Sequence, residues 1–168
     1  MQRLKLEFDL AEDVGSVSVV KSHLIDYVEL STSVIGNLRI TAGGKLEEFS
    51  EIPLVMISTS LVNSSWALTT FGTNGSEEIV TIPDHEPSVS LKIQDGAILF
   101  SVVFRGSDLC STLCPVYEFL RIIGSFHGSI SRYLVEKNPH LLSIESFRHT
   151  YPGAEYISKL GKLELTRN

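Results

Sequence analysis

Two amphipathic helix patterns interrupt a chain that otherwise alternates between apolar and polar residues, and this combination constrains the fold more than any other feature. The longer pattern runs from Pro115 to about Lys137, and the shorter one begins at Pro53. The remaining segments show the two-residue period of short strands. Such a mixture predicts an α+β domain, but it indicates no particular reaction.

The longer helix is predicted from apolar residues spaced three and four apart, which place one apolar stripe along the helix. Pro115 suits the first turn, and Asn138-Pro139 suits the end. Gly124 and Gly128 lie four residues apart and each costs roughly 1 kcal/mol relative to alanine. We therefore expect them to permit close packing on one face. The stripe comprises Val116, Phe119, Leu120, Ile123, Phe126, Ile130, Tyr133 and Leu134.

The shorter helix is predicted to start at Ser50 and Pro53 and to bury a stripe of its own. Trp66 lies beside that stripe, so we expect it in the core. Serine and threonine are frequent here, which leaves the end of the helix open, and Gly72 lies beyond it. The stripe comprises Leu54, Ile57, Leu61 and Leu68.

Short strands are predicted wherever alternation falls between turn residues. Asp95-Gly96 is the strongest hairpin signal, because both central residues of a type I′ turn need positive φ. The segment from Ser107 to Cys114 is either a connection or a short edge strand. The other expected strands are residues 4–10, a segment around Val17 and Val19, residues 25–30, 38–41 (between a Gly36-Asn37 turn and Gly43-Gly44), 79–82, 89–93, 98–104 and a weak strand near Leu163.

The chain length of 168 residues predicts a single domain spanning residues 1–168. With 43% hydrophobic and 20% charged residues, the composition is that of a globular protein. We expect a mostly antiparallel, curved sheet of about five to seven strands that packs one face on the two helices. Because the first residues alternate and form no apolar stretch, we expect no signal peptide and a cytoplasmic location. No apolar run is long enough for a membrane span.

The net charge of −6 and the pI near 5.3 argue against nucleic acid as a partner, since phosphates require a basic face. They permit a basic protein partner, because complementary charge steers association.

Motifs that would indicate catalysis or a cofactor are missing. Cys110 and Cys114 form a C-x3-C pair, whereas zinc sites favour C-x2-C and need two further ligands. We expect two small buried side chains and no metal or cofactor. His127 is expected at the edge of the helical stripe with one hydrogen bond, although a triad assembled in space remains an alternative. No G-x-S-x-G elbow and no phosphate-binding loop occurs.

Two groups of carboxylates are the candidate functional residues. One group precedes the shorter helix, and the other surrounds the strand at residues 79–82. Charge runs are most often solvated surface, but paired carboxylates also bind partners, hold metals or transfer protons. The predicted partner-binding residues are Glu77, Glu78, Asp84 and Glu86, followed by Glu47 and Glu48, with Glu51 beside them.

The order of elements resembles that of small bacterial immunity proteins, including those that neutralise contact-dependent growth inhibition toxins. The resemblance rests on the stretch from Glu51 to Ile57, which continues to Leu61 and Trp66 and is followed by an alternating hairpin and a helix that ends near Asn-Pro. It covers residues 45–140. It implies an acidic, cytosolic, non-catalytic inhibitor of a toxin domain, and no motif assigns individual residues.

The sequence therefore predicts a non-catalytic protein-binding module, most concretely an immunity protein that covers the basic cleft of a toxin domain. The first alternative is a small enzyme with a pocket between sheet and helix, using His127 or the acidic cluster. The second alternative is a small-ligand binder with an apolar pocket in the same place.

Overall fold

The computed structural model describes residues 4–10 and 27–143 of the chain. The described part is an α+β domain, which confirms the predicted fold class. Its elements in chain order are β1 (Lys5–Leu10), α2 (Tyr27–Ser33), β2 (Ile35–Ala42), β3 (Lys45–Pro53), α3 (Leu54–Phe71), β4 (Glu77–Thr81), β5 (Ser88–Gln94), β6 (Ala97–Phe104), β7 (Ser107–Pro115), α4 (Val116–Lys137) and the 3-10 helix η1 (Pro139–Ser143).

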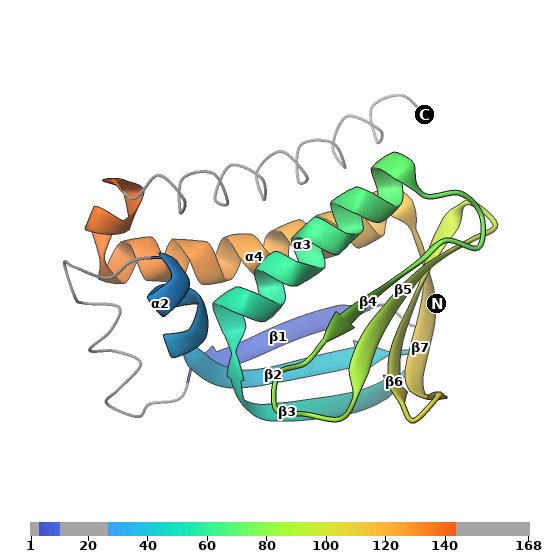
Figure 1. Ribbon diagram of the computed structural model, residues 1–168, viewed down its shortest axis with the longest axis horizontal. Helices are drawn as coiled ribbons and strands as arrows, with labels where there is room; N and C mark the ends of the chain where they lie inside the picture. Colours follow the sequence, from blue (N-terminus) through green and yellow to red (C-terminus); the bar gives the residue numbers. More distant parts are fainter. Residues whose placement is uncertain (1–3, 11–26, 144–168) are drawn as a thin grey trace.

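The strands form two antiparallel sheets, and the two long helices lie together on one side of them (Figure 1). One sheet has the order β1-β2-β3, and the other has the order β4-β5-β6-β7. The expected number of strands is therefore found, but in two sheets instead of one. Helix α3 packs beside α4 and also contacts β4, whereas α4 contacts β1 and β7.

Three of the hairpins turn through two residues with positive φ. The φ angles are 58° and 80° at Gly43-Gly44, 51° and 76° at Asp95-Gly96, and 49° and 78° at Arg105-Gly106. This is the geometry of type I′ turns, whose twist matches that of the flanking strands. The predicted Asp95-Gly96 hairpin is thus confirmed, with Gln94 opposite Ala97.

A proline joins strand to helix at both long helices. Pro53 is the last residue of β3 and the N-cap of α3, and Pro115 has the same place between β7 and α4. Proline lacks the amide that a strand would need to continue, and it is tolerated where a helix begins. The unit of hairpin, proline and helix therefore occurs twice, although the sequence shows no repeat.

The two sheets meet where the β2–β3 turn lies against the outer edge of β7. A Cβ atom on Gly43 would lie within 2.3 Å of the Ser111 carbonyl oxygen. The Lys45 ammonium donates to the Leu109 carbonyl at 3.2 Å. The outer edge of β3 is covered in a similar way, because His85 Nε2 lies 2.9 Å from the Ser50 carbonyl oxygen. The edges of β3 and β7 are thus protected by local contacts.

The core lies between the helices and the inner faces of both sheets. Phe119 and Ile123 on α4 are fully buried, as their place on the apolar stripe predicts. Phe100 on β6 is fully buried as well, and Cys110 and Cys114 on β7 are buried as free thiols. The prediction that the two cysteines are small buried side chains is confirmed.

Five local predictions are wrong, including the edge position expected for His127, which is 2% exposed. Residues 27–30, predicted as a strand, belong to helix α2, and Gly36-Asn37 lies within β2 instead of forming a turn. Trp66 is 48% exposed instead of buried in the core. Gly128 makes no close approach, because a Cβ atom there would meet nothing within 4 Å. The predicted strands around Val17 and near Leu163 lie outside the described residues.

The errors at residues 27–30 and at Gly36-Asn37 have simple physical causes. A short apolar run fits a buried helix turn as well as a strand, so residues 27–30 were ambiguous. Gly36 is required by close approach, since a Cβ atom would lie 2.4 Å from the Asp9 carbonyl oxygen. The glycine therefore permits strand packing and does not mark a turn.

Candidate binding surface along strand β4

Strand β4 is the edge strand of the four-stranded sheet, and within the described residues it pairs only with β5. The N–H of Ile93 donates to the Ser76 carbonyl at 2.9 Å. Because antiparallel pairing alternates every two residues, the backbone groups of Glu78 and Val80 face β5. Those of Ile79 and Thr81 then face away from the sheet. The open edge of β4 therefore presents backbone donors and acceptors to its surroundings.

A groove of about 440 Å³ runs along this open edge, between β4 and α3. Its walls are uncharged: hydroxyl, amide and apolar groups alternate. Ile79 is 63% exposed, an unusual degree for a large aliphatic side chain on a strand. The lining residues are Met56, Ile57, Ser60, Asn63 and Ser64 from α3, and Ile79, Val80, Thr81 and Pro83 from β4.

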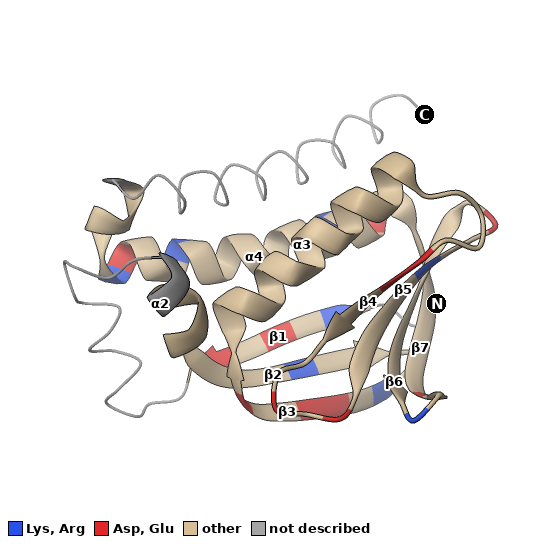
Figure 2. Cartoon of the chain, viewed as in Figure 1, with Lys and Arg blue, Asp and Glu red and all other residues tan. Residues whose placement is uncertain are grey.

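Helix α3 has no charged residue along its 18 positions, and Figure 2 shows it without acidic or basic colouring. Its exposed positions include Asn63, Trp66 and Phe71, and the two aromatic rings meet edge to face at 5.4 Å. The uncharged groove wall is therefore continuous with an uncharged helix surface.

Acidic residues lie at both ends of β4. Glu77 and Glu78 begin the strand, and Asp84 and Glu86 lie in the loop that follows it. Figure 2 shows these acidic segments on either side of the uncharged middle of the strand. Glu77 accepts a hydrogen bond from the Ser90 hydroxyl at 2.5 Å, which holds its carboxylate over the outer face of the sheet.

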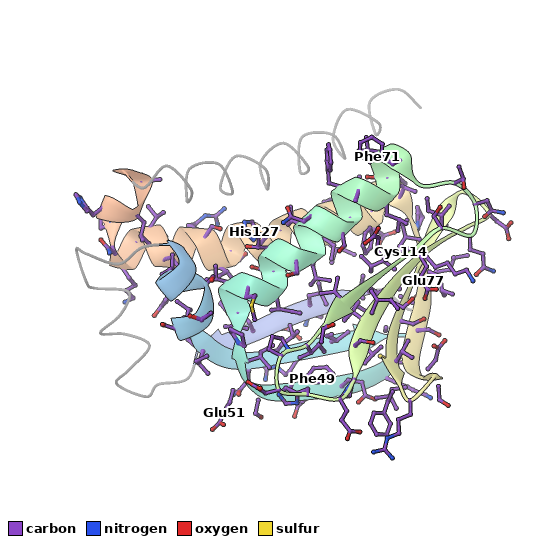
Figure 3. The ribbon with its side chains drawn as sticks, in the orientation of Figure 1. Phe49, Glu51, Phe71, Glu77, Cys114 and His127 are labelled. Carbon is purple, nitrogen blue, oxygen red and sulfur yellow. The ribbon has the colours of Figure 1, made fainter. Side chains whose placement is uncertain are left out.

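The loop after β4 is fixed to strand β3. His85 binds the Ser50 carbonyl, and its ring meets that of Phe49 edge to face at 5.6 Å. Asp84 has a φ of 59°, and Glu51, next to Ser50, has a φ of 57° in the bulge opposite β2. Figure 3 shows Glu51 at the lower edge of the view, well away from Glu77 on the right.

The six predicted partner-binding carboxylates do not form one cluster. Glu77 and Glu78 lie at one end of β4, and Asp84 and Glu86 lie at the other. Glu86 pairs with Arg105 at 3.0 Å, where both side chains are exposed. An exposed pair of this kind contributes little stability and leaves both groups hydrated.

The two remaining predicted carboxylates lie on strand β3 and face opposite sides of its sheet. Glu48 is exposed opposite Arg39, whereas Glu47 is half-buried opposite Ile40 on the core side. Neither lines the groove beside β4. The sequence placed Glu47 and Glu48 with the helix that follows them, and the strand character of β3 separates their side chains.

A second groove, of about 430 Å³, lies between the edge strand β1 and α4. It is strongly charged, with Lys5, Arg39 and Arg121 beside Glu7 and Asp9. Most of these charged groups pair with one another: Arg39 binds Asp9 at 2.5 Å, and Lys5 binds Glu7 at 2.7 Å. The Lys5 hydrogen bond holds the pKa of Glu7 below its ordinary value.

His127 is a core residue and does not lie at the edge of the stripe as predicted. It is 2% exposed, and it lines neither groove. Its Nδ1 lies 3.0 Å from the Ser58 hydroxyl on α3, and its Nε2 lies 3.4 Å from the Ser131 hydroxyl. Figure 3 shows it on α4 where this helix passes α3. A substrate has no open route to this ring in the described structure.

The cysteines are unsuited to nucleophilic chemistry. Burial raises the pKa of both thiols, and the Glu47 carboxylate raises that of Cys110 further. Among residues 4–10 and 27–143, no group of three or more histidine, cysteine or acidic side chains is placed to hold a metal ion. None of the helices in the same ranges is long and apolar enough to span a membrane.

Sequence reasoning missed the residues that line the groove. The residues Ser60, Asn63 and Ser64 looked like poor helix formers. Their spacing of three and four residues places them on one uncharged face of α3. Ile79 was predicted only as part of the strand at residues 79–82, with no indication that its side chain would be exposed. The signal available in the sequence was the complete lack of charge from Leu54 to Phe71. Comparison of the chain with protein families, curated proteins and solved structures gives no match.

Proposed function

We propose that the protein is a non-catalytic protein-binding module whose partner is a basic protein. The observation that supports this proposal is the arrangement along β4, where an uncharged open strand edge lies between two acidic ends. A surface with an apolar centre and a polar, charged periphery is the usual anatomy of a protein interface. The net charge of −6 would steer a basic partner toward it.

The interior supports a binding role over the enzyme alternative. His127, the best candidate for a general base, has serine hydroxyls at both ring nitrogens and is enclosed between two helices. The carboxylates are spread over both ends of β4 and both faces of the β3 sheet, so they converge on no common point. Both grooves are open to solvent along a strand edge, whereas ligand pockets usually enclose most of a small molecule.

The most concrete form of the proposal is a bacterial immunity protein, acting in the cytoplasm, that neutralises a toxin domain. Its mechanism would be occlusion: the acidic ends of β4 contact basic groups around the toxin cleft, and the uncharged middle excludes water. Interfaces of this kind gain association rate from charge and affinity from a few buried anchors. Ile79 and the exposed aromatic pair of α3 are suitable anchors.

The test is an association measurement with a basic toxin domain encoded next to this gene. Exchanging Glu77, Glu78 and Glu86 for lysine should slow association, and the slowing should shrink as salt rises from about 50 to about 500 mM. Asp84 is better changed to asparagine, because asparagine tolerates its positive φ.

Glu136→Lys is the matched control, since it reverses one exposed charge on α4 away from β4. It should leave the rate nearly unchanged, and melting temperatures should show that all variants remain folded. Equal association rates for wild type and the triple variant would remove β4 from the interface. Turnover of a substrate by the isolated protein would instead support the enzyme alternative.

A further inference from the structure

We propose that β4 binds its partner by strand addition, and that the added segment has uncharged, β-branched residues at its centre and lysine or arginine at both ends. This inference rests on the proposed protein-binding function and specifies its mode. In strand addition, main-chain hydrogen bonds supply affinity, and alternate side chains supply specificity.

The first support is that no second strand pairs with the outer edge of β4 among residues 4–10 and 27–143. Natural edge strands are blunted by lysines, prolines or bulges, or they are covered by other segments. The outer edges of β3 and β7 are covered by His85 and by the Gly43–Lys45 turn. Strand β4 presents Ile79 at 63% exposure and the outward backbone groups of Ile79 and Thr81.

The second support is the groove itself, which places uncharged walls on either side of the position of an added strand. A strand added at about 4.8 Å from β4 would lie against Ser60, Asn63 and Ser64 of α3. Its side chains would point alternately toward α3 and toward the outer face beside Ile79. A buried charge at these central positions would lack a partner, so uncharged residues are favoured there.

The third support is charge at the two ends, which decides between possible occupants. In an antiparallel pairing with a second copy of this chain centred on Ile79, Glu77 would face Thr81. In the same register, residue 84 of the second copy falls opposite residue 74, so its acidic loop would begin about 10 Å beyond Glu77. Like charges would then lie near one another at both ends, which disfavours self-association. A partner segment with basic ends would place opposite charges at the same two positions.

The test is selection from a displayed library of random peptides about nine residues long, which span about 30 Å when extended. The full chain is the bait. We expect enriched peptides with basic residues near both ends and β-branched residues between them. Selection with the variant Glu77→Gln, Glu78→Gln, Asp84→Asn, Glu86→Gln should lose the basic bias. Enrichment of peptides without that bias by the wild type, or no enrichment at all, would overturn the proposal.

Backbone pairing is tested on the peptide, so that the fold of the protein is not disturbed. The best selected peptide is made with N-methyl groups on its odd residues, and separately on its even residues. Strand addition uses only alternate amides, so one series should bind at least about tenfold more weakly than the other. Equal weakening in both series would contradict strand pairing. Hydrogen exchange at Ile79 and Thr81 should slow on binding, and unchanged exchange there would also contradict it.

A protein variant separates this inference from the proposed function. Ile79→Pro removes one outward amide from the edge strand, whereas Ile79→Thr keeps the amide and shortens the side chain. Against a basic toxin domain that binds the wild type, Ile79→Pro should weaken binding far more than Ile79→Thr. If Ile79→Pro binds that domain normally with an unchanged melting temperature, strand addition fails while the binding function stands. If the wild type binds no basic partner, the function itself fails.

Discussion

His127 on α4 and Ser58 on α3 form a buried link between the two long helices, with 3.0 Å between Nδ1 and the hydroxyl oxygen. The Ser58 hydroxyl donates to the Val55 carbonyl at 3.1 Å, so its oxygen accepts from the ring. Nδ1 then bears the proton, and Nε2 accepts from the Ser131 hydroxyl. The ring therefore joins α3 to α4 through its two serine partners.

Ser58→Ala should therefore destabilise the fold without altering binding. It leaves a buried ring N–H without its serine acceptor, a loss of about 1–3 kcal/mol in the free energy of unfolding. Chemical denaturation gives this value. Ser60→Ala, on the same helix but half-buried in the groove, is the control and should change stability by no more than about 0.5 kcal/mol. Equal effects of the two changes would show that the Ser58 link contributes nothing.

Gly43→Ala should cost more stability than Gly96→Ala, although both glycines have positive φ. A Cβ atom at residue 96 meets nothing within 4 Å, so alanine there has only a conformational cost of roughly 1–2 kcal/mol. At residue 43 the Cβ would also press on the Ser111 carbonyl at 2.3 Å. The turn would have to move away from β7. Denaturation midpoints that coincide for the two variants would mean that the sheets are not held together at this turn.

Gly128→Ala should increase the free energy of unfolding, in contrast to the substitutions above. The residue lies in the middle of α4, its φ is not positive, and a Cβ atom there meets nothing within 4 Å. Alanine should add about 0.5–1 kcal/mol by reducing the freedom of the unfolded chain. Thermal melting measures the gain. A lower melting temperature would indicate that the surface at residue 128 is in contact with another group.

The sequence pattern was sufficient where one local rule dominated. The alternation of residues 5–10, the Asp95-Gly96 turn and the stripe containing Phe119 are each specified by nearby residues, and all three are confirmed. The strand β3 was not recognised, because its exposed positions are occupied by carboxylates such as Glu48. Its core positions, Phe49 and Ile52, are interrupted by the bulge at Glu51, which breaks the two-residue period.

The candidate site was harder to predict, because it depends on pairing between distant segments. The sequence identified the acidic residues around β4, yet it gave no sign that Asp84 and Glu86 approach β3 through His85. Nor did it indicate which strand would be left at an edge. Ile79 is exposed because its side chain lies on the outer face of an edge strand, whereas Val80 faces the core, and the edge position follows only from the strand order β4-β5-β6-β7.

The free energy of unfolding should decrease at alkaline pH, because the buried thiols ionise less readily in the folded protein than in the unfolded chain. Burial, followed by the Glu47 carboxylate, raises the pKa of Cys110 above the value of about 8.5 that a free cysteine has in the unfolded chain. A raised folded-state pKa means that the neutral thiol stabilises the fold fully below the unfolded-state pKa. This contribution is lost as the pH rises through the folded-state pKa. The free energy of unfolding, measured by urea denaturation, should therefore decrease between about pH 8 and about pH 10.

Two variants assign this alkaline loss to Cys110. Cys110→Ala cannot ionise, so the decrease between the two pH values should be smaller than in the wild type. Glu47→Gln removes the nearby carboxylate, which should lower the Cys110 pKa and reduce the decrease in part. Alkylation by iodoacetamide at about pH 8 should be slow in the folded protein and fast in urea, because only the thiolate of an accessible cysteine reacts. An identical pH dependence in wild type and Cys110→Ala would assign the loss to other groups.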